Sequence, residues 1–134
     1  MTEFAWPVRV YYEDTDAGGV VYHANYLHFM ERARTEWLRA MGFEQDELKS
    51  QMDVLFAVRS MNLEYYSPAR FNDSLMVTVK IINLRGASMM LEQDIKKENE
   101  SGVLCQGKVR IVCLTASSFR PCPIPTQIQQ LVKL

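Results

Sequence analysis

The sequence is poor in the side chains that bind metals and form disulfides. Its 134 residues include three cysteines and two histidines. Cys105, Cys113 and Cys122 cannot all pair within one chain, and their spacing matches no zinc or CxxC pattern. His23 and His28 belong to no HExxH motif and to no Cys/His cluster. We therefore expect a protein without a metal site or a cofactor, with its thiols in a reducing compartment.

The sequence also lacks a concentration of charge of one sign and a long apolar run. Fifteen basic residues are matched by sixteen acidic ones, which gives a formal net charge of -1, and the basic residues are scattered. We therefore expect no nucleic-acid partner. The first residues, MTEFAWPVRV, have no basic segment followed by an apolar one, and no apolar run approaches the roughly 20 residues of a membrane span. These absences predict no membrane span and a cytoplasmic location.

The composition is that of a folded protein with one domain. Apolar residues make up 48% of the chain and charged residues 23%, close to the averages for globular proteins. Because 134 residues lie within the usual size of one domain, we expect a single domain over residues 1–134.

One segment has the apolar periodicity of a helix that is buried on one side. From Asn25 onward, apolar residues recur at i, i+3, i+4 and i+7, a spacing that predicts an amphipathic helix of about four turns. Asn25 or a neighbour is expected to cap its start, and Gly42 is expected to end it. The apolar positions are Tyr26, Phe29, Met30, Ala33, Trp37 and Leu38.

Most of the remaining chain is predicted to form β-strands. The expected strands are Trp6–Tyr12, Val54–Tyr66, Leu75–Leu84, Met89–Ile95 and Val103–Leu114, with short helices at 45–50 and 126–134. One long helix with strands joined by short connections is typical of an α+β fold with an antiparallel sheet. We expect the helix to be buried in a curved sheet, whose exposed edges favour dimerisation by edge pairing.

The stretch EDTDAGGVVYH, residues 13–23, places carboxylates and two glycines just before the predicted helix. Aspartates and glycines are common in plain turns. The position favours a second interpretation, because the first turn of a helix has free N–H groups and a partial positive charge. If Gly18 and Gly19 allow close approach, the amides of Tyr22 and His23 can hold a carbonyl oxygen that becomes negative.

Asp16 and His23 are the candidate catalytic side chains of this loop. An unperturbed aspartate is ionised at neutral pH, so Asp16 can act as a nucleophile, through an anhydride, or as a general base toward water. His23 is expected to be mostly neutral at the positive end of the helix and to position substrate or water. Asp14 is expected to shape the turn through local hydrogen bonds.

Three motifs together resemble a known family. Residues 12–26, YEDTDAGGVVYHANY, resemble the signature of hotdog-fold thioesterases of the 4-hydroxybenzoyl-CoA thioesterase type. The resemblance is closer still to the YbgC group of bacterial acyl-CoA thioesterases associated with the Tol-Pal system. Residues 63–75, LEYYSPARFNDSL, match the family's strand-turn-strand pattern, and residues 85–88, RGAS, precede a strand as in the family. The resemblance extends over residues 7–125.

The resemblance implies a hotdog fold, in which an antiparallel five-stranded sheet wraps around one long central helix. It implies homodimers with one continuous sheet, often assembled into homotetramers, with active sites at the dimer interface. Asp16 is then the catalytic carboxylate, and the amide near His23 polarises the thioester carbonyl. The turn containing Arg85, Gly86 and Ser88 is implied to lie near the pantetheine or nucleotide of the substrate.

Two pairs of side chains admit two interpretations each. Tyr65 and Tyr66 can line an acyl-binding pocket, with Tyr66 contacting substrate, or belong to the core. Glu31 and Glu36 can supply a helix carboxylate, as in another branch of hotdog thioesterases. Alternatively, Glu36 forms a surface pair with Arg32 at i,i+4 spacing.

The expected function is hydrolysis of an acyl-CoA or acyl-carrier-protein thioester to acid and thiol. One rival is a hotdog hydratase or dehydratase, although the His-Phe-Pro type motif of those dehydratases is missing from the sequence. The other is a non-catalytic module that binds acyl-carrier protein or an envelope-biogenesis partner. Asp16, the two glycines and His23 argue against such a module, since a pure binder has no need of a carboxylate beside an oxyanion site. The length of the acyl chain is left open.

Overall fold

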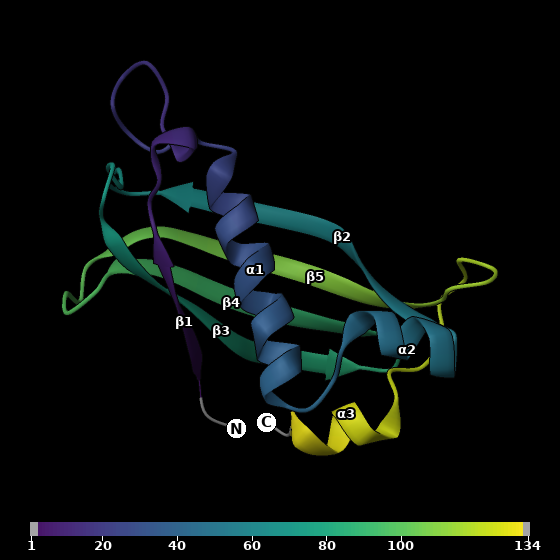
Figure 1. The fold of residues 1–134 in the computed structure, drawn as a ribbon. Coiled ribbons are helices and arrows are strands. Elements are labelled where there is room, and N and C mark those ends of the chain that lie inside the picture. The colour runs from purple at the N-terminus through teal and green to yellow at the C-terminus, as the bar shows by residue number, and fades with distance from the viewer. Residues whose placement is uncertain (1–2, 133–134) are drawn as a thin grey trace.

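The chain folds into a five-stranded antiparallel sheet with one long helix lying across it (Figure 1). The computed structural model describes residues 3–132. The strands are β1 (Phe4–Arg9), β2 (Val54–Tyr65), β3 (Ser74–Arg85), β4 (Ser88–Lys97) and β5 (Val103–Thr115). Their order in the sheet is β1-β3-β4-β5-β2, and each neighbouring pair is antiparallel. The predicted α+β fold with an antiparallel sheet is confirmed.

The first strand ends earlier than the sequence predicts. β1 stops at Arg9, and a short 3-10 helix, η1 (Tyr12–Asp14), replaces the expected continuation. The cause is local, because the carboxylate of Asp14 accepts the backbone N–H of Tyr11 at 2.8 Å. Aspartate side chains that bond to a nearby backbone amide compete with strand pairing in this way.

The long helix, α1 (Asn25–Ala40), begins and ends as its sequence indicates, with one difference. Ala24 occupies the cap position without a side-chain hydrogen bond, and Asn25 directs its side chain elsewhere. At the other end, Gly42 has a φ of 95° and donates to the carbonyl of Arg39, while Phe43 donates to the carbonyl of Leu38. These two bonds form a Schellman motif, which requires the left-handed backbone that glycine adopts without strain.

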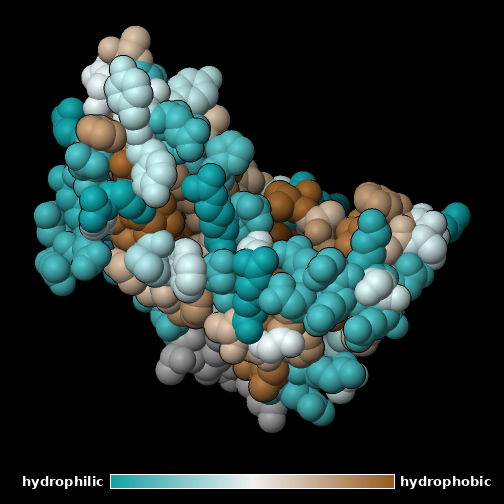
Figure 2. Space-filling view, viewed as in Figure 1, coloured by the Kyte–Doolittle hydropathy of each residue, from teal (hydrophilic) through white to brown (hydrophobic). Residues whose placement is uncertain are grey.

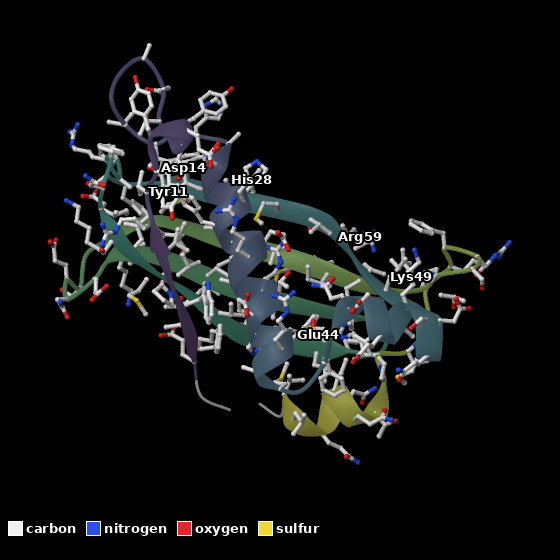
Figure 3. The ribbon with its side chains drawn as sticks, in the orientation of Figure 1. Tyr11, Asp14, His28, Glu44, Lys49 and Arg59 are labelled. Atoms are coloured by element: carbon white, nitrogen blue, oxygen red, sulfur yellow. The ribbon has the colours of Figure 1, made fainter. Side chains whose placement is uncertain are left out.

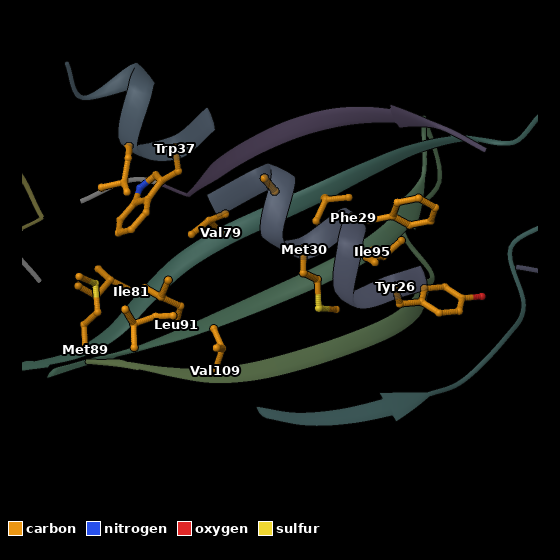
Figure 4. Close-up of a cluster of buried hydrophobic side chains, with 14 of the residues drawn as sticks. Tyr26, Phe29, Met30, Trp37, Val79, Ile81, Met89, Leu91, Ile95 and Val109 are labelled. Atoms are coloured by element: carbon orange, nitrogen blue, oxygen red, sulfur yellow. The ribbon is translucent and has the colours of Figure 1, made fainter. Parts of the chain in front are cut away.

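The core forms where α1 packs on the sheet (Figure 4). All six apolar positions predicted for the helix are buried. The helix comes very close to the sheet at Gly107 in β5, where an added Cβ atom would lie 2.7 Å from Sδ of Met30 and 3.1 Å from Cδ2 of Leu63. Glycine at this position therefore lets Met30, which is fully buried, rest directly on the sheet backbone.

Two short helices pack at the end of the sheet away from the acidic loop (Figure 1). They are α2 (Gln45–Met52) and α3 (Thr126–Leu131), as predicted, although residues 133 and 134 of the predicted terminal helix lie outside the described residues. No helix within residues 3–132 is long and apolar enough to cross a membrane.

The outer strand β2 has an unpaired edge. Among residues 3–132 it bonds to one strand only, β5, and most of its residues from Val58 to Tyr65 are exposed. The register shifts within β2 between Val58 and Ser60, and within β3 between Ile81 and Asn83. Such bulges bend a strand and increase its twist, so the sheet curves as the sequence predicts.

The contact between Met30 and Gly107 leads to a prediction about stability. Gly107→Val should lower the free energy of unfolding by about 1–3 kcal/mol, because overpacking a filled core forces side chains out of their rotamers. Gly102→Val is the matched control, since no atom lies within 4 Å of an added Cβ there. Urea unfolding of both variants measures the difference, and equal stability would show that the helix does not depend on this close approach.

Candidate active site

The acidic loop is a small, closed ribbon fixed to the connection between β2 and β3. Val20 bridges to Arg70, and Val21 donates to the carbonyl of Ala69 at 2.8 Å. Within the loop, the amide of Asp16 donates to the carbonyl of Val20, and the amide of Gly19 donates to the carbonyl of Asp16. The loop conformation is therefore set by backbone hydrogen bonds.

The two loop glycines have different physical roles. Gly19 has a φ of 79°, which a residue with a side chain adopts only with strain. The amide of Gly18 donates to Oδ1 of Asp16 at 2.8 Å, and a Cβ atom on Gly18 would come within 3.2 Å of that oxygen. Glycine at 18 thus keeps the space beside the Asp16 carboxylate open.

Asp16 is exposed and has one carboxylate oxygen available. Its Oδ1 is held by Gly18, and its Oδ2 has no hydrogen-bond donor among residues 3–132. A carboxylate that is oriented through one oxygen and free at the other has the geometry of a nucleophile or a general base.

Asp14 holds the loop to the start of α1 (Figure 3). It is buried, with 5% of its surface exposed. Its Oδ2 accepts the amide of Tyr11, and its Oδ1 accepts Nδ2 of Asn25 at 2.8 Å. Its backbone carbonyl accepts the amide of Tyr22 at 2.9 Å. The prediction that Asp14 shapes the turn is confirmed.

The prediction that the backbone amides of Tyr22 and His23 together hold the substrate oxygen needs a correction. The amide of Tyr22 is occupied by Asp14, so it cannot also bind a substrate oxygen. Within the described part of the chain, the amides of His23 and Ala24 have no acceptor. Both precede Asn25, the first residue of α1, where free amides and the helix dipole favour negative charge.

A shallow depression of about 240 Å³ opens beside His23. Tyr65 donates its hydroxyl to the carbonyl of His23 at 2.9 Å, and Tyr26 accepts the amide of Ala69 at 3.1 Å. These bonds connect the helix start to the β2–β3 connection. The lining residues are Val21, His23, Tyr26, Tyr65, Tyr66, Ser67 and Pro68.

Of the residues lining this depression, Tyr65 and Tyr66 are not core residues. Their exposed fractions are 48% and 60%, so the interpretation that placed them in the core is wrong. Tyr26 and Val21 are the buried residues of the lining. Desolvation raises the pKa of the Tyr26 hydroxyl, and the hydrogen bond with Ala69 offsets part of that rise. The apolar period of the helix predicts Tyr26 as a core residue, but no signal in the sequence indicates that its hydroxyl connects to the β2–β3 segment.

The helix carboxylates form local pairs. Glu36 pairs with Arg39 at 2.8 Å, so the predicted pair with Arg32 is wrong. Glu31 accepts a hydrogen bond from the hydroxyl of Thr35 at 2.5 Å.

The turn that contains Arg85, Gly86 and Ser88 is not brought to the acidic loop. Arg9 at the loop end of β1 pairs with Ser74 at the start of β3, whereas Arg85 is the last residue of β3. At roughly 3.3 Å per residue, the twelve residues of β3 separate the two regions by about 35 Å within one chain. The predicted site residues therefore divide into two groups at opposite ends of the sheet.

Comparisons with known proteins agree with the fold. The model of the thioesterase-like superfamily matches residues 10–132. Acyl-CoA thioester hydrolase YbgC of Escherichia coli O6:H1 is 48% identical over 127 residues, which cover 95% of this chain and 93% of that protein. Acyl-CoA thioesterase YbgC of Haemophilus influenzae is 40% identical over 126 residues, 94% of this chain and 91% of that protein.

A solved structure agrees as well. A probable thioesterase from Bartonella henselae superimposes with a TM-score of 0.87 at 35% identity, covering 92% of this chain and all of that one. The architecture seen here, an antiparallel sheet with a helix across it, is the hotdog fold of these thioesterases. On the family match, the identities and the fold, the chain belongs to the thioesterase-like superfamily of hotdog-fold proteins.

Proposed function

We propose that the protein is an acyl-CoA thioesterase that hydrolyses its substrate to free acid and thiol. The observation that carries the proposal is the Asp16 carboxylate, which is oriented through one oxygen and free at the other. It belongs to the same loop that ends at the free amides of His23 and Ala24. The names of the Escherichia coli and Haemophilus influenzae relatives support acyl-CoA as the substrate.

The proposed reaction uses this loop in two ways. The thioester carbonyl oxygen accepts hydrogen bonds from the amides of His23 and Ala24, which stabilise the negative charge that develops on it. Loss of one such donor typically costs about 2.7–4 kcal/mol of transition-state stabilisation. Asp16 either attacks the carbonyl carbon, expelling the thiolate and leaving an anhydride that water cleaves, or removes a proton from an attacking water.

We further propose that the site is completed by a second copy of the chain, in a homodimer or a tetramer of two such dimers. If the free edge of β2 pairs antiparallel with that of a second copy, the Tyr65 end of one strand lies beside the Val54 end of the other. Ser88 lies at the Val54 end, because it pairs with Val112, which pairs with Ala57 of β2. The acidic loop of one copy then faces the β3–β4 turn of the other.

The proposed substrate contacts follow from that arrangement. Tyr66 lies on the rim of the depression beside His23, where the acyl thioester enters. Arg85, Gly86 and Ser88 of the second copy lie near the pantetheine or nucleotide. Because CoA and acyl-carrier protein share the pantetheine arm, either can deliver the acyl group. A cytoplasmic location agrees with three cysteines that form no disulfide.

Changing carboxylates to amides within the loop tests the role of Asp16. Asp16→Asn should lower kcat/KM for thiol release at least about a hundredfold, the lower range of general-base catalysis, with little change in thermal stability. Glu13→Gln is the matched control at an exposed position of the same loop. Asp14→Asn should instead reduce stability, because its new amide nitrogen cannot accept from Tyr11 or Asn25. If Asp16→Asn has the same kcat/KM as the wild type, Asp16 is only a turn residue and the proposed mechanism is refuted.

His23 is predicted to position the substrate or the water. His23→Ala keeps the backbone amide but should lower turnover about ten- to hundredfold, since small misplacements of reacting groups have effects of that size. His28→Ala, at an exposed position of α1, should leave turnover unchanged. If His23→Ala has normal turnover, the side chain has no part in the reaction.

Complementation between two inactive variants tests the shared site. Asp16→Asn and Arg85→Ala chains, carrying different tags and produced together, should form mixed dimers in which one of the two sites has both residues intact. Such dimers, purified through both tags, should have about half the wild-type turnover per dimer. If the purified mixed dimers recover no turnover, Asp16 and Arg85 do not act in the same site across the interface.

A further inference from the structure

Two peptide groups at the start of α1 carry the free amides that are proposed to hold the substrate oxygen. The group that joins Tyr22 to His23 contains the His23 N–H, and the group that joins His23 to Ala24 contains the Ala24 N–H. Because a peptide group is planar, whatever holds its carbonyl oxygen also fixes the direction of its N–H. The partners of the two carbonyls therefore decide where the free amides point.

Both carbonyls have a hydrogen-bond donor. The carbonyl of Tyr22 accepts the backbone amide of Asn25 at 2.8 Å. The carbonyl of His23 accepts the side-chain hydroxyl of Tyr65 at 2.9 Å. Among residues 3–132, Tyr65 is the one side chain that bonds to either carbonyl.

Tyr65 is itself held by the sheet and by the helix. It is the last residue of β2 and pairs with Cys105 of β5. The next residue, Tyr66, donates its amide to the carbonyl of Leu104 at 2.8 Å. The Tyr65 ring packs edge-to-face on Tyr26, with ring centroids 5.5 Å apart and an interplanar angle of 71°, a favoured arrangement of aromatic pairs. The position of the Tyr65 hydroxyl is therefore set outside the acidic loop.

The location of the helix start explains why it needs such a support. The acidic loop and the beginning of α1 project from the body of the molecule at the top of Figure 2. Here the helix contacts the β2–β3 connection, through the Tyr65 bond and through the bond from Ala69 to the Tyr26 hydroxyl. A hydrogen bond from the end of β2 thus fixes the first peptide groups of the helix relative to the sheet.

The same bond strengthens the amide as a donor. A hydrogen bond to a carbonyl polarises the whole peptide group, and bonds in a chain reinforce one another. With the Tyr65 hydroxyl on the His23 carbonyl, the Ala24 N–H is a better donor to an oxygen on its other side. Preorganised donors of this kind act most strongly where negative charge develops in the transition state.

We propose that Tyr65 is a positioning residue for thioester hydrolysis, which orients and polarises the Ala24 amide through the carbonyl of His23. The inference rests on the proposed thioesterase function and adds a residue from β2 to its oxyanion site. Tyr65 acts on the peptide group and needs no contact with the substrate oxygen.

The bond can be observed without the reaction. His–Ala occurs once in the sequence, at residues 23–24, so histidine labelled with 13C at the carbonyl and 15N-labelled alanine together give one signal for this peptide group. Tyr65→Phe should shift both the His23 carbonyl and the Ala24 amide resonances. Tyr11→Phe, at an exposed tyrosine near the loop, should shift neither. If the His23 carbonyl resonance is the same in Tyr65→Phe and in the wild type, the proposal is overturned.

Kinetics test the role of the bond in the reaction. On the best substrate of a panel from acetyl-CoA to palmitoyl-CoA, Tyr65→Phe should lower kcat about three- to tenfold, the effect of one hydrogen bond. KM should change by less than about twofold, because the interaction is gained in the transition state. An unchanged kcat, or a change in KM alone, overturns this inference and leaves the proposed function standing. If the wild type hydrolyses no member of the panel, the proposed function fails and this role of Tyr65 fails with it.

A pH profile separates a hydrogen-bond donor from a merely structural ring. Partial burial raises the pKa of the Tyr65 hydroxyl, with smaller contributions from Cys105 and Tyr26, so the wild-type group keeps its proton at neutral pH. Incorporation of 3,5-difluorotyrosine at position 65 keeps the shape of the ring and lowers this pKa. Since a phenolate cannot donate a hydrogen bond, kcat should fall about three- to tenfold as the pH rises through the lowered pKa.

The wild type is the reference for this profile. His23 is the other titratable group beside the hydroxyl, and it is present in both proteins, so the ratio of the two profiles isolates position 65. The same fluorinated residue at position 11 should give the wild-type profile. If the profiles of the position 65 variant and the wild type differ only by a constant factor, Tyr65 does not act as a donor and the proposal is overturned.

Discussion

The burial of α1 against the sheet is the constraint on which the candidate site depends. Met30 rests on Gly107 with no side chain between them, and Phe29 and Ala33 are fully buried beside it. Because this contact fixes the helix along its length, it also fixes where the helix begins. The free amides at that point, and the depression beside His23, therefore occupy a defined place relative to the sheet.

The loop before the helix places two aspartates in different environments. Asp14 is buried and uses both carboxylate oxygens and its carbonyl to connect η1, the loop and α1. Asp16 is exposed and uses one oxygen within the turn. Because Asp14 is buried with a hydrogen bond on each carboxylate oxygen and Asp16 is exposed with one oxygen free, Asp16 is the aspartate that we propose for thioester cleavage. Gly19 adopts the positive φ that the turn requires, and Gly18 leaves the Asp16 carboxylate accessible.

The elements that the sequence predicts well are those with a strong local signal. The helix follows from its apolar period and from Gly42, and the four strands from Val54 onward follow from β-branched residues between turn residues. The hydrogen-bond partners across the loop have no comparable local signal in the sequence. The prediction that Asp14 shapes the turn follows from its residue type, but nothing in the spacing indicates that its carbonyl would accept the amide of Tyr22, because that bond depends on the three-dimensional path of the loop.

Long-range placement is the other part that the sequence does not reveal. The turn at Arg85 and the loop at Asp16 appear as neighbours in function through the family resemblance, yet β3 holds them apart within one chain. A cavity of about 150 Å³ beside Trp37, between α1 and the sheet, is equally invisible in the sequence, where Trp37 is simply an apolar position of a helix. Its unpaired N–H emerges only when the surrounding strands are in place.

The most direct test of thioester hydrolysis is the stoichiometry of its products. Wild-type protein is incubated with a panel of acyl-CoAs from acetyl to palmitoyl, including an aromatic ester. Free thiol is titrated while mass spectrometry quantifies the acyl product. The account predicts equal amounts of thiol and free carboxylic acid for at least one member of the panel. Water added to or lost from an acyl chain that stays attached to CoA would indicate a hydratase or dehydratase, and no change in any substrate would indicate a binding module; either result would contradict the account.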